Sequence, residues 1–240
     1  MGKIYCYECR RLLWNKFFAG LAVVLLLYGG FTLCAVTLLG VSHTAPFSPW
    51  SFGDYLCRML PLQWIGMQFF LTFFTSRGAR RAAALTDAAP MDPRRYALAR
   101  CAAALTGGLL LALLCMGEAA VLYGCLFGWY DWVSLLPPAL VTLLPALVFA
   151  LGSGWLLGRV RPWLVYVWML APFAWAALPL PAALGAWNGW LFREYPLTLG
   201  TLDPAFSVPA PVLAAQGGLL VLGAALLAVR PGAARRPAKV

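Results

Sequence analysis

Residues 17–41 read FFAGLAVVLLLYGGFTLCAVTLLGV, an apolar run that contains no charged side chain. A transmembrane helix needs about 20 mostly apolar residues, so this run is long enough to cross a lipid bilayer. The whole chain has the same character, because 62% of its 240 residues are apolar types and only 11% are charged. Soluble domains are about half apolar and about a quarter charged. The sequence therefore predicts an integral membrane protein rather than a soluble globular one.

Five further stretches have a similar length and composition, and charged or Pro- and Gly-rich residues separate them. We therefore expect six transmembrane helices, at Phe17–Val41, Leu56–Thr75, Tyr96–Tyr123, Val133–Gly158, Trp163–Leu184 and Val208–Val229. At about 22 residues each, these spans use roughly 130 positions, which leaves no connection long enough for a separate soluble catalytic domain. The expected fold is an all-α integral membrane protein in which residues 17–229 form one six-helix transmembrane domain.

Basic residues set the predicted orientation. The chain has 18 Lys and Arg against 8 Asp and Glu, a formal net charge of +10. In the six-span arrangement every basic residue except Arg58 and Arg193 falls in segments on one side of the membrane. Because cytoplasmic loops carry excess Lys and Arg near the ends of spans, we expect both termini to be cytoplasmic. This indicates a multi-pass protein of the cell membrane, such as a bacterial plasma membrane, that contacts membrane lipids and no nucleic acid.

Residues 1–16 are amphipathic when wound as a helix. Apolar side chains gather on one arc, whereas Glu8 and Arg11 lie among the polar residues on the rest, and Trp14 can lie at the level of the lipid headgroups. We expect an interfacial amphipathic helix on the cytoplasmic surface. The alternative is an ordinary basic flank without defined structure.

A basic segment at residues 76–95 separates the second and third expected spans. Residues 80–89 are rich in helix formers, and Pro90 and Pro93 end that pattern before Arg94 begins the next span. The sequence thus predicts a short basic helix at the cytoplasmic face. It is either a charged topological hairpin or a docking element for a cytoplasmic partner, and the residue pattern alone favours neither.

Residues 185–207 form the longest remaining connection, on the outer side. Trp187, Trp190, Phe192 and Tyr195 make this segment too apolar for a solvated loop. We expect it to dip into the outer leaflet or to anchor the protein to lipid as an aromatic belt. After the last span, residues 230–240 are expected to form a basic cytoplasmic tail.

Most catalytic and metal sites need residues that this chain lacks. It has one histidine, His43, and no Gly-x-x-x-x-Gly-Lys-Ser/Thr motif, which argues against His-based catalysis and P-loop nucleotide hydrolysis. Cys6 and Cys9 supply only half of a zinc site. Glu118 is the ionisable residue that we place inside the membrane, so it is a candidate functional residue; pairing with Arg58 or lipid headgroups near the outer boundary is the alternative. We expect no enzymatic activity, cofactor or metal in this chain.

The arrangement resembles the membrane subunit of an ABC exporter, in the ABC type-2 permease family. The six spans with both ends inside and the apolar outer loop contribute to this resemblance. Its sequence motifs are Glu8-x-x-Arg11-x-x-x-x-Asn15-Lys16-Phe17-Phe18, Ser76-Arg77 followed by Arg80-Arg81, and Pro90-Met91-Asp92-Pro93-Arg94-Arg95-Tyr96-x-Leu98-x-Arg100. In that family a similar run ends a helix at proline and restarts the third span with basic residues and an aromatic.

The resemblance implies that residues 1–16 are the interfacial connecting helix and that the basic segment is a coupling helix. The coupling helix would contact a separate cytoplasmic ABC ATPase, which binds ATP and Mg. The contact residues implied are Arg77, Arg80, Arg81, Leu85, Pro90, Arg94 and Arg95. Two permeases, a second copy or a homologue, would form a path for a hydrophobic or amphipathic substrate, and the smaller members of the family export peptide antibiotics or protect against them. Gly78 and the pair Ala88-Ala89 depart from the family's pattern.

Other classes remain open. The substrate-capturing membrane subunit of a vitamin importer also has several spans and no ATPase of its own, but the long basic segment argues against it. A membrane enzyme is disfavoured because His, Asp and Glu are not clustered. A noncatalytic membrane scaffold is compatible with everything in the sequence.

Overall fold

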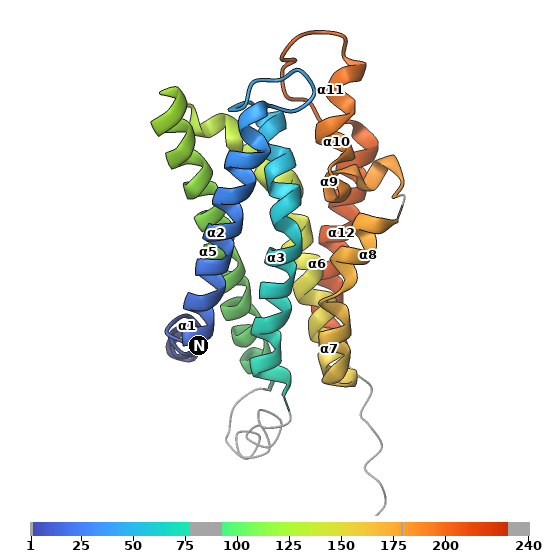
Figure 1. Cartoon of the computed structure of the whole chain (residues 1–240). Helices are drawn as coiled ribbons and strands as arrows, with labels where there is room; N and C mark the ends of the chain where they lie inside the picture. The colour runs from blue at the N-terminus through green and yellow to red at the C-terminus, as the bar shows by residue number, and fades with distance from the viewer. Residues whose placement is uncertain (1, 77–92, 179, 230–240) are drawn as a thin grey trace, which may run out of the picture.

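The structure is a computed structural model that describes residues 2–76, 93–178 and 180–229. The described residues are mostly helical and include no strand. The long helices stand side by side as an elongated bundle (Figure 1). The predicted all-α fold is therefore confirmed.

The bundle has five long helices and a set of short elements among the described residues. The long helices are α2 (Lys16–Ala35), α3 (Pro49–Thr75), α5 (Pro93–Phe127), α6 (Leu136–Val160) and α12 (Ala210–Ala228). The short helices are α1 (Gly2–Leu13), α7 (Trp163–Trp168), α8 (Ala171–Ala177), α9 (Gly185–Asn188), α10 (Trp190–Arg193) and α11 (Tyr195–Thr198), with 3-10 turns at η1 (Thr37–Leu39), η2 (Trp132–Leu135) and η3 (Ala182–Leu184). Helix α1 lies at one end of the bundle, hereafter the α1 end, and α9 to α11 lie towards the other, the opposite end (Figure 1).

Four helical stretches are long and apolar enough to cross a membrane. They are Lys16–Leu39, Arg95–Phe127, Trp132–Val160 and Ala210–Ala228. These stretches coincide with the first, third, fourth and sixth expected spans, which confirms those helices and indicates a multi-pass membrane protein. The second and fifth expected spans take other forms.

Helix α3 occupies the second expected span and begins earlier than predicted, at Pro49 rather than Leu56. The Ser48 side chain accepts a hydrogen bond from the backbone N–H of Ser51 at 3.2 Å, which caps the start of the helix. The 27-residue helix is long enough to span a bilayer. It is not one of the four apolar stretches, because Asp54 and Arg58 in its first turns and Gln63 and Gln68 further along interrupt its apolar sequence.

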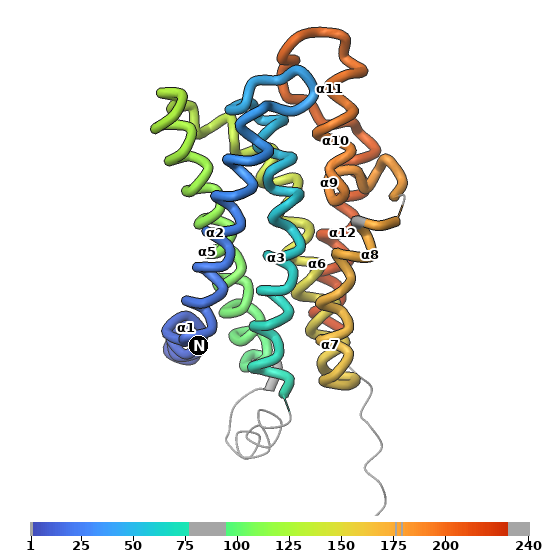
Figure 2. The backbone as a smooth tube through the Cα atoms, viewed as in Figure 1, coloured from blue at the N-terminus to red at the C-terminus, as the bar shows by residue number. Residues whose placement is uncertain are grey.

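The fifth expected span, Trp163–Leu184, is not one continuous helix. The chain forms α7 and then α8, which rise from the α1 end beside α3 and α6 (Figure 2). Pro172 has no N–H to donate to the carbonyl of Trp168, so the helical ladder is interrupted there. The indole Nε1 of Trp64 donates to this Trp168 carbonyl at 2.9 Å instead. A neighbouring helix thus satisfies the polar group that the break exposes.

Glycines allow the closest helix packing in the bundle. A Cβ on Gly152 of α6 would lie 2.1 Å from the Gly223 carbonyl oxygen of α12, so these two helices meet backbone to backbone. Gly154 and Gly158 of α6, two small residues four positions apart, instead face α3, where added Cβ atoms would meet Gln68 and Thr75. Ala214 and Gly218 of α12 have the same spacing but are exposed, and a Cβ at Gly218 would meet nothing within 4 Å. That pair therefore does not pack against other described residues.

The apolar connection at residues 185–207 folds back onto the start of α3. Trp187 and Phe192 are buried, and Gly53 leaves room for the Phe192 ring, since a Cβ at position 53 would lie 2.1 Å from that ring. The indole Nε1 of Trp50 donates to the Pro204 carbonyl at 2.8 Å. The largest apolar side chains of this segment therefore pack inward on the bundle rather than outward towards lipid.

Candidate functional site

The α1 end holds a buried charged cluster built around Glu8. Glu8 lies on α1 and is 1% exposed, although the sequence pattern placed it among the polar residues of the amphipathic helix. Its carboxylate accepts a hydrogen bond from the Tyr96 hydroxyl at 3.0 Å and from Arg100 Nε at 3.4 Å, both on α5. The Arg11 guanidinium lies 3.6 Å from the other carboxylate oxygen. We call Glu8, Arg11, Tyr96 and Arg100 the Glu8 cluster.

Arg100 connects this cluster to α3 as well. Its guanidinium Nη2 donates to the Tyr96 hydroxyl at 2.6 Å, and its Cζ lies 4.1 Å from the centre of the Tyr96 ring and 5.6 Å from that of Phe74. Phe74 is in the last turn of α3. Because the Arg100 guanidinium lies over rings from both helices, it holds the end of α3 and the start of α5 together.

Two further contacts fix α1 against α5. The hydroxyls of Tyr5 and Thr106 share a hydrogen bond of 2.7 Å. Leu12 is buried, and a Cβ at Gly107 would lie 2.7 Å from its side chain. Helix α1 is thus attached to α5 over more than one turn, by polar and apolar contacts together.

Of the remaining residues predicted for the interfacial helix and the coupling segment, the structure describes three. Trp14 follows α1 and is 87% exposed, which suits a side chain at the headgroup level. Arg94 and Arg95 lie in the first turn of α5, and the Arg95 side chain is exposed. The other predicted coupling residues lie outside the described residues: Arg77, Arg80, Arg81, Leu85 and Pro90.

Glu118, the predicted intramembrane residue, packs against a glycine pair of α2. A Cβ on Gly29 would lie 2.3 Å from the Oε2 of Glu118, and a Cβ on Gly30 would lie 3.1 Å from its Oε1. The Glu118 carboxylate therefore occupies space that a side chain at position 29 or 30 would need. The Tyr55 hydroxyl of α3 donates to Oε2 at 3.4 Å. The predicted alternative partner Arg58 pairs instead with Asp54, so the predicted Glu118–Arg58 pair is wrong, whereas the pairing of Glu118 with lipid headgroups stays a prediction.

A second charged cluster lies near the opposite end, at residues that were not among the predicted sites. Asp54 is 1% exposed and pairs with Arg58 Nε at 2.8 Å and Arg193 Nε at 3.2 Å. Asp54 and Arg58 are four residues apart on α3, a spacing that places oppositely charged side chains on one helix face. That spacing was the one signal of this ion pair in the sequence. Arg193 lies on α10, far along the chain, so the sequence alone could not predict that it pairs with Asp54.

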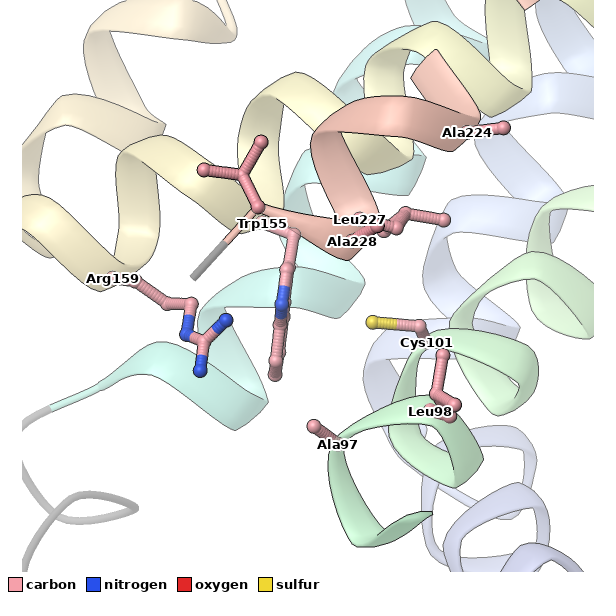
Figure 3. Close-up of a pocket in the computed structure, with 9 residues that line it drawn as sticks. Ala97, Leu98, Cys101, Trp155, Arg159, Ala224, Leu227 and Ala228 are labelled. Atoms are coloured by element: carbon pink, nitrogen blue, oxygen red, sulfur yellow. The ribbon is translucent and has the colours of Figure 1, made fainter. Parts of the chain in front are cut away.

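A pocket of about 590 Å³ opens at the α1 end between α5, α6 and α12. Figure 3 shows Trp155 and Arg159 of α6 facing Cys101 of α5, with Leu227 and Ala228 of α12 beside them. The Arg159 guanidinium lies over the Trp155 ring, 5.5 Å from its centre. The lining is otherwise apolar, so this pocket suits hydrocarbon more than a polar solute.

Metal ligands do not gather in the described part of the chain. No group of three or more His, Cys, Asp or Glu side chains there could hold an ion. Cys6 is exposed on α1 and Cys9 is half-buried, and both thiols are free.

A scan of the chain against models of known protein families finds no match, and comparisons with curated proteins and with solved structures find none either. A functional assignment therefore depends on the residues themselves and on their geometry.

Proposed function

We propose that the chain is the membrane-spanning permease subunit of an ABC exporter, driven by a separate cytoplasmic ATPase. The observation that carries this proposal is the Glu8 cluster. Residues 77–92 connect α3 to α5, and Arg100 contacts Phe74 before this connection and Glu8 on α1. A partner that pushes on the connection would therefore move α1, α3 and α5 together, as a coupling device requires.

The proposed topology has six crossings with both termini in the cytoplasm. In it, α3 is the second crossing, although polar side chains interrupt its apolar sequence. Helices α7 and α8 together are the fifth crossing, although the helix is broken between them. The α1 end would be cytoplasmic, which agrees with the position of most basic residues in the sequence. ATP and Mg would bind only to the partner ATPase, and residues Arg77 to Pro90 would contact it.

A second permease, a copy or a homologue, would complete the translocation path for a hydrophobic or amphipathic substrate, such as a peptide. Many exposed side chains on the long helices are apolar, including Leu27 and Phe31 of α2 and Val221 of α12. Such surfaces can face lipid or a second membrane subunit.

The test is a pull-down of the C-terminally tagged chain from its native membrane in mild detergent, followed by an ATPase assay. We expect an ATPase to copurify with the wild type and to be lost from the double variant Arg80→Glu/Arg81→Glu. The matched control, Arg161→Glu, changes the same kind of charge elsewhere and should retain the ATPase. If no ATPase copurifies with the wild type, the proposal fails and a membrane scaffold becomes the better assignment.

The topology has its own test. Cys6 on α1 and Cys125 near the far end of α5 are both exposed. In sealed, right-side-out vesicles, a membrane-impermeant maleimide should label a variant that retains only Cys125 and spare one that retains only Cys6. The opposite labelling pattern would show that the protein has the reverse orientation. Equal labelling of the two variants would contradict the odd number of crossings that the proposed topology places between Cys6 and Cys125.

One observation favours a second candidate, the substrate-capturing subunit of an importer. A cavity near the opposite end is lined by helices and connections of one chain, the kind of site that such a subunit would use. The two candidates differ in stoichiometry, because the exporter requires two permeases for each complex. The mass of the purified complex therefore distinguishes them.

A further inference from the structure

The cavity near the opposite end combines charge with an aromatic wall. Its volume is about 380 Å³, and it lies between α3, α8 and the short helices of the 185–207 segment. Asp54, Arg58 and Arg193 line it together. It is separate from the Glu8 cluster and from the pocket at the α1 end.

The charges in this cavity do not balance. Asp54 is the single carboxylate, and Arg58 and Arg193 both pair with it through Nε. One positive charge is therefore in excess. Within residues 2–76, 93–178 and 180–229, the Arg58 guanidinium has no other hydrogen-bond acceptor. A guanidinium carries five N–H donors, so donors remain available for an anion that enters the cavity.

Both arginines are accessible from the cavity, although their carboxylate partner is not. The side chain of Arg58 is 36% exposed and that of Arg193 is 47% exposed, against 2% for Asp54. Trp187 also lines the cavity, and its indole Nε1 is buried with no hydrogen-bond partner among the described residues. A planar guanidinium matches the geometry of a phosphate or carboxylate group and can bind it through two N–H donors.

The rest of the lining is apolar, and part of it continues onto the outer surface of the bundle. Trp175 and Trp187 pack with ring centres 4.8 Å apart and form an aromatic wall. Tyr28 on α2 and Phe173 on α8 also line the cavity, and they are 42% and 53% exposed. An anion held at the arginines would therefore have apolar surface beside it, where a hydrocarbon chain can lie.

We propose that this cavity binds the headgroup of an anionic amphiphile, with its phosphate or carboxylate between Arg58 and Arg193 and its hydrocarbon against Phe173 and Tyr28. Asp54 orients both guanidinium groups and reduces the net charge of the site. The proposal does not depend on the partner ATPase, because binding is a property of this chain alone.

The test is lipid binding to the purified full chain, measured by native mass spectrometry after titration in detergent. The probes are phosphatidylglycerol, which is anionic, and phosphatidylcholine, which is zwitterionic, with the same acyl chains. Inorganic phosphate serves as a competitor, to distinguish a lipid headgroup from a free anion. We expect phosphatidylglycerol to bind in preference to phosphatidylcholine and millimolar phosphate to displace little of it.

Two variants should change the affinity in opposite directions. Arg58→Gln removes charge-assisted donors but leaves Asp54 paired with Arg193, and it should weaken phosphatidylglycerol binding about tenfold. Asp54→Asn removes the competing carboxylate and should tighten binding about fivefold. Arg161→Gln, at the α1 end, is the matched control and should leave binding unchanged. A thermal melt of each variant shows whether it is folded.

Three results would overturn the proposal. The first is equal loss of binding in Arg58→Gln and Arg161→Gln, which would show a general charge effect. The second is weaker binding in a folded Asp54→Asn variant, because an ion-pair cluster with a purely structural role would give that result. The third is complete displacement by inorganic phosphate, which would make the site one for a free anion rather than an amphiphile.

Discussion

The indole Nε1 of Trp64 donates to the Trp168 carbonyl oxygen at 2.9 Å, across the break between α7 and α8. Pro172 leaves this carbonyl without its usual helical donor. An unpaired carbonyl in an apolar environment is costly, so one side chain of α3 makes the broken segment compatible with a membrane. The same Trp64 ring packs 4.8 Å from that of Trp175 on α8, so the break is enclosed by aromatic side chains.

Trp64→Phe should therefore destabilise the protein by about 1–3 kcal/mol, because it leaves the Trp168 carbonyl buried and unpaired. The measurement is the free energy of unfolding from an SDS titration of helicity in mixed micelles. Pro172→Ala supplies an N–H that can bond to the same carbonyl. In the Pro172→Ala background the Trp64→Phe penalty should shrink by about 1 kcal/mol. Equal penalties in both backgrounds would contradict this account.

The close contact between α6 and α12 makes a second prediction. A Cβ at Gly223 would lie 2.7 Å from backbone atoms of Phe149, which cannot move aside as a side chain can. Gly223→Ala should therefore cost about 2 kcal/mol or more. Gly218→Ala on the same helix is the control: a Cβ there meets nothing within 4 Å. Because Ala favours helix over Gly, the control should be neutral or stabilising by up to about 1 kcal/mol. Similar melting shifts for both variants would rule out this packing.

Local composition predicted some elements of this fold and missed others. Four spans could be predicted because each is a continuous apolar run, and such a run needs no knowledge of its neighbours. The start of α3 was missed because Asp54 and Arg58 resemble loop residues in a hydropathy profile. Their four-residue spacing was visible in the sequence, and it indicates one helix face.

The charged sites depend on contacts between distant parts of the chain. The partner of Glu8 is Arg100, a separation of 92 residues. An amphipathic pattern places a lone carboxylate on the solvated face, and only the packing of α1 on α5 reverses this. Likewise, Pro172 accounts for the break in the fifth expected span, but the donor that makes the break tolerable lies on α3.

The Glu8 cluster makes a third prediction. The Arg100 side chain is 10% exposed, and the Glu8→Gln variant would leave the buried Arg100 guanidinium without an anionic partner. This variant should lose about 3 kcal/mol of stability. Arg11→Gln is the control, because the Arg11 side chain is 49% exposed and lies 3.6 Å from the carboxylate. It should cost under about 1 kcal/mol. If Arg11→Gln were as destabilising as Glu8→Gln, the carboxylate would not act mainly through Arg100.

Gly29 makes the fourth prediction, because its lack of a side chain provides the space that Glu118 occupies. A Cβ there would lie 2.3 Å from Glu118 Oε2 and 2.9 Å from the Tyr55 hydroxyl. Gly29→Ala should displace the carboxylate and cost about 1–3 kcal/mol, whereas Gly20→Ala on the same helix, where nothing lies within 4 Å, should not destabilise. The double variant Gly29→Ala/Glu118→Ala removes the clashing carboxylate. Its loss of stability should be about 1 kcal/mol smaller than the sum of the losses in the two single variants. An additive result would mean that Gly29 serves close packing of α2 with α3 rather than a place for the carboxylate.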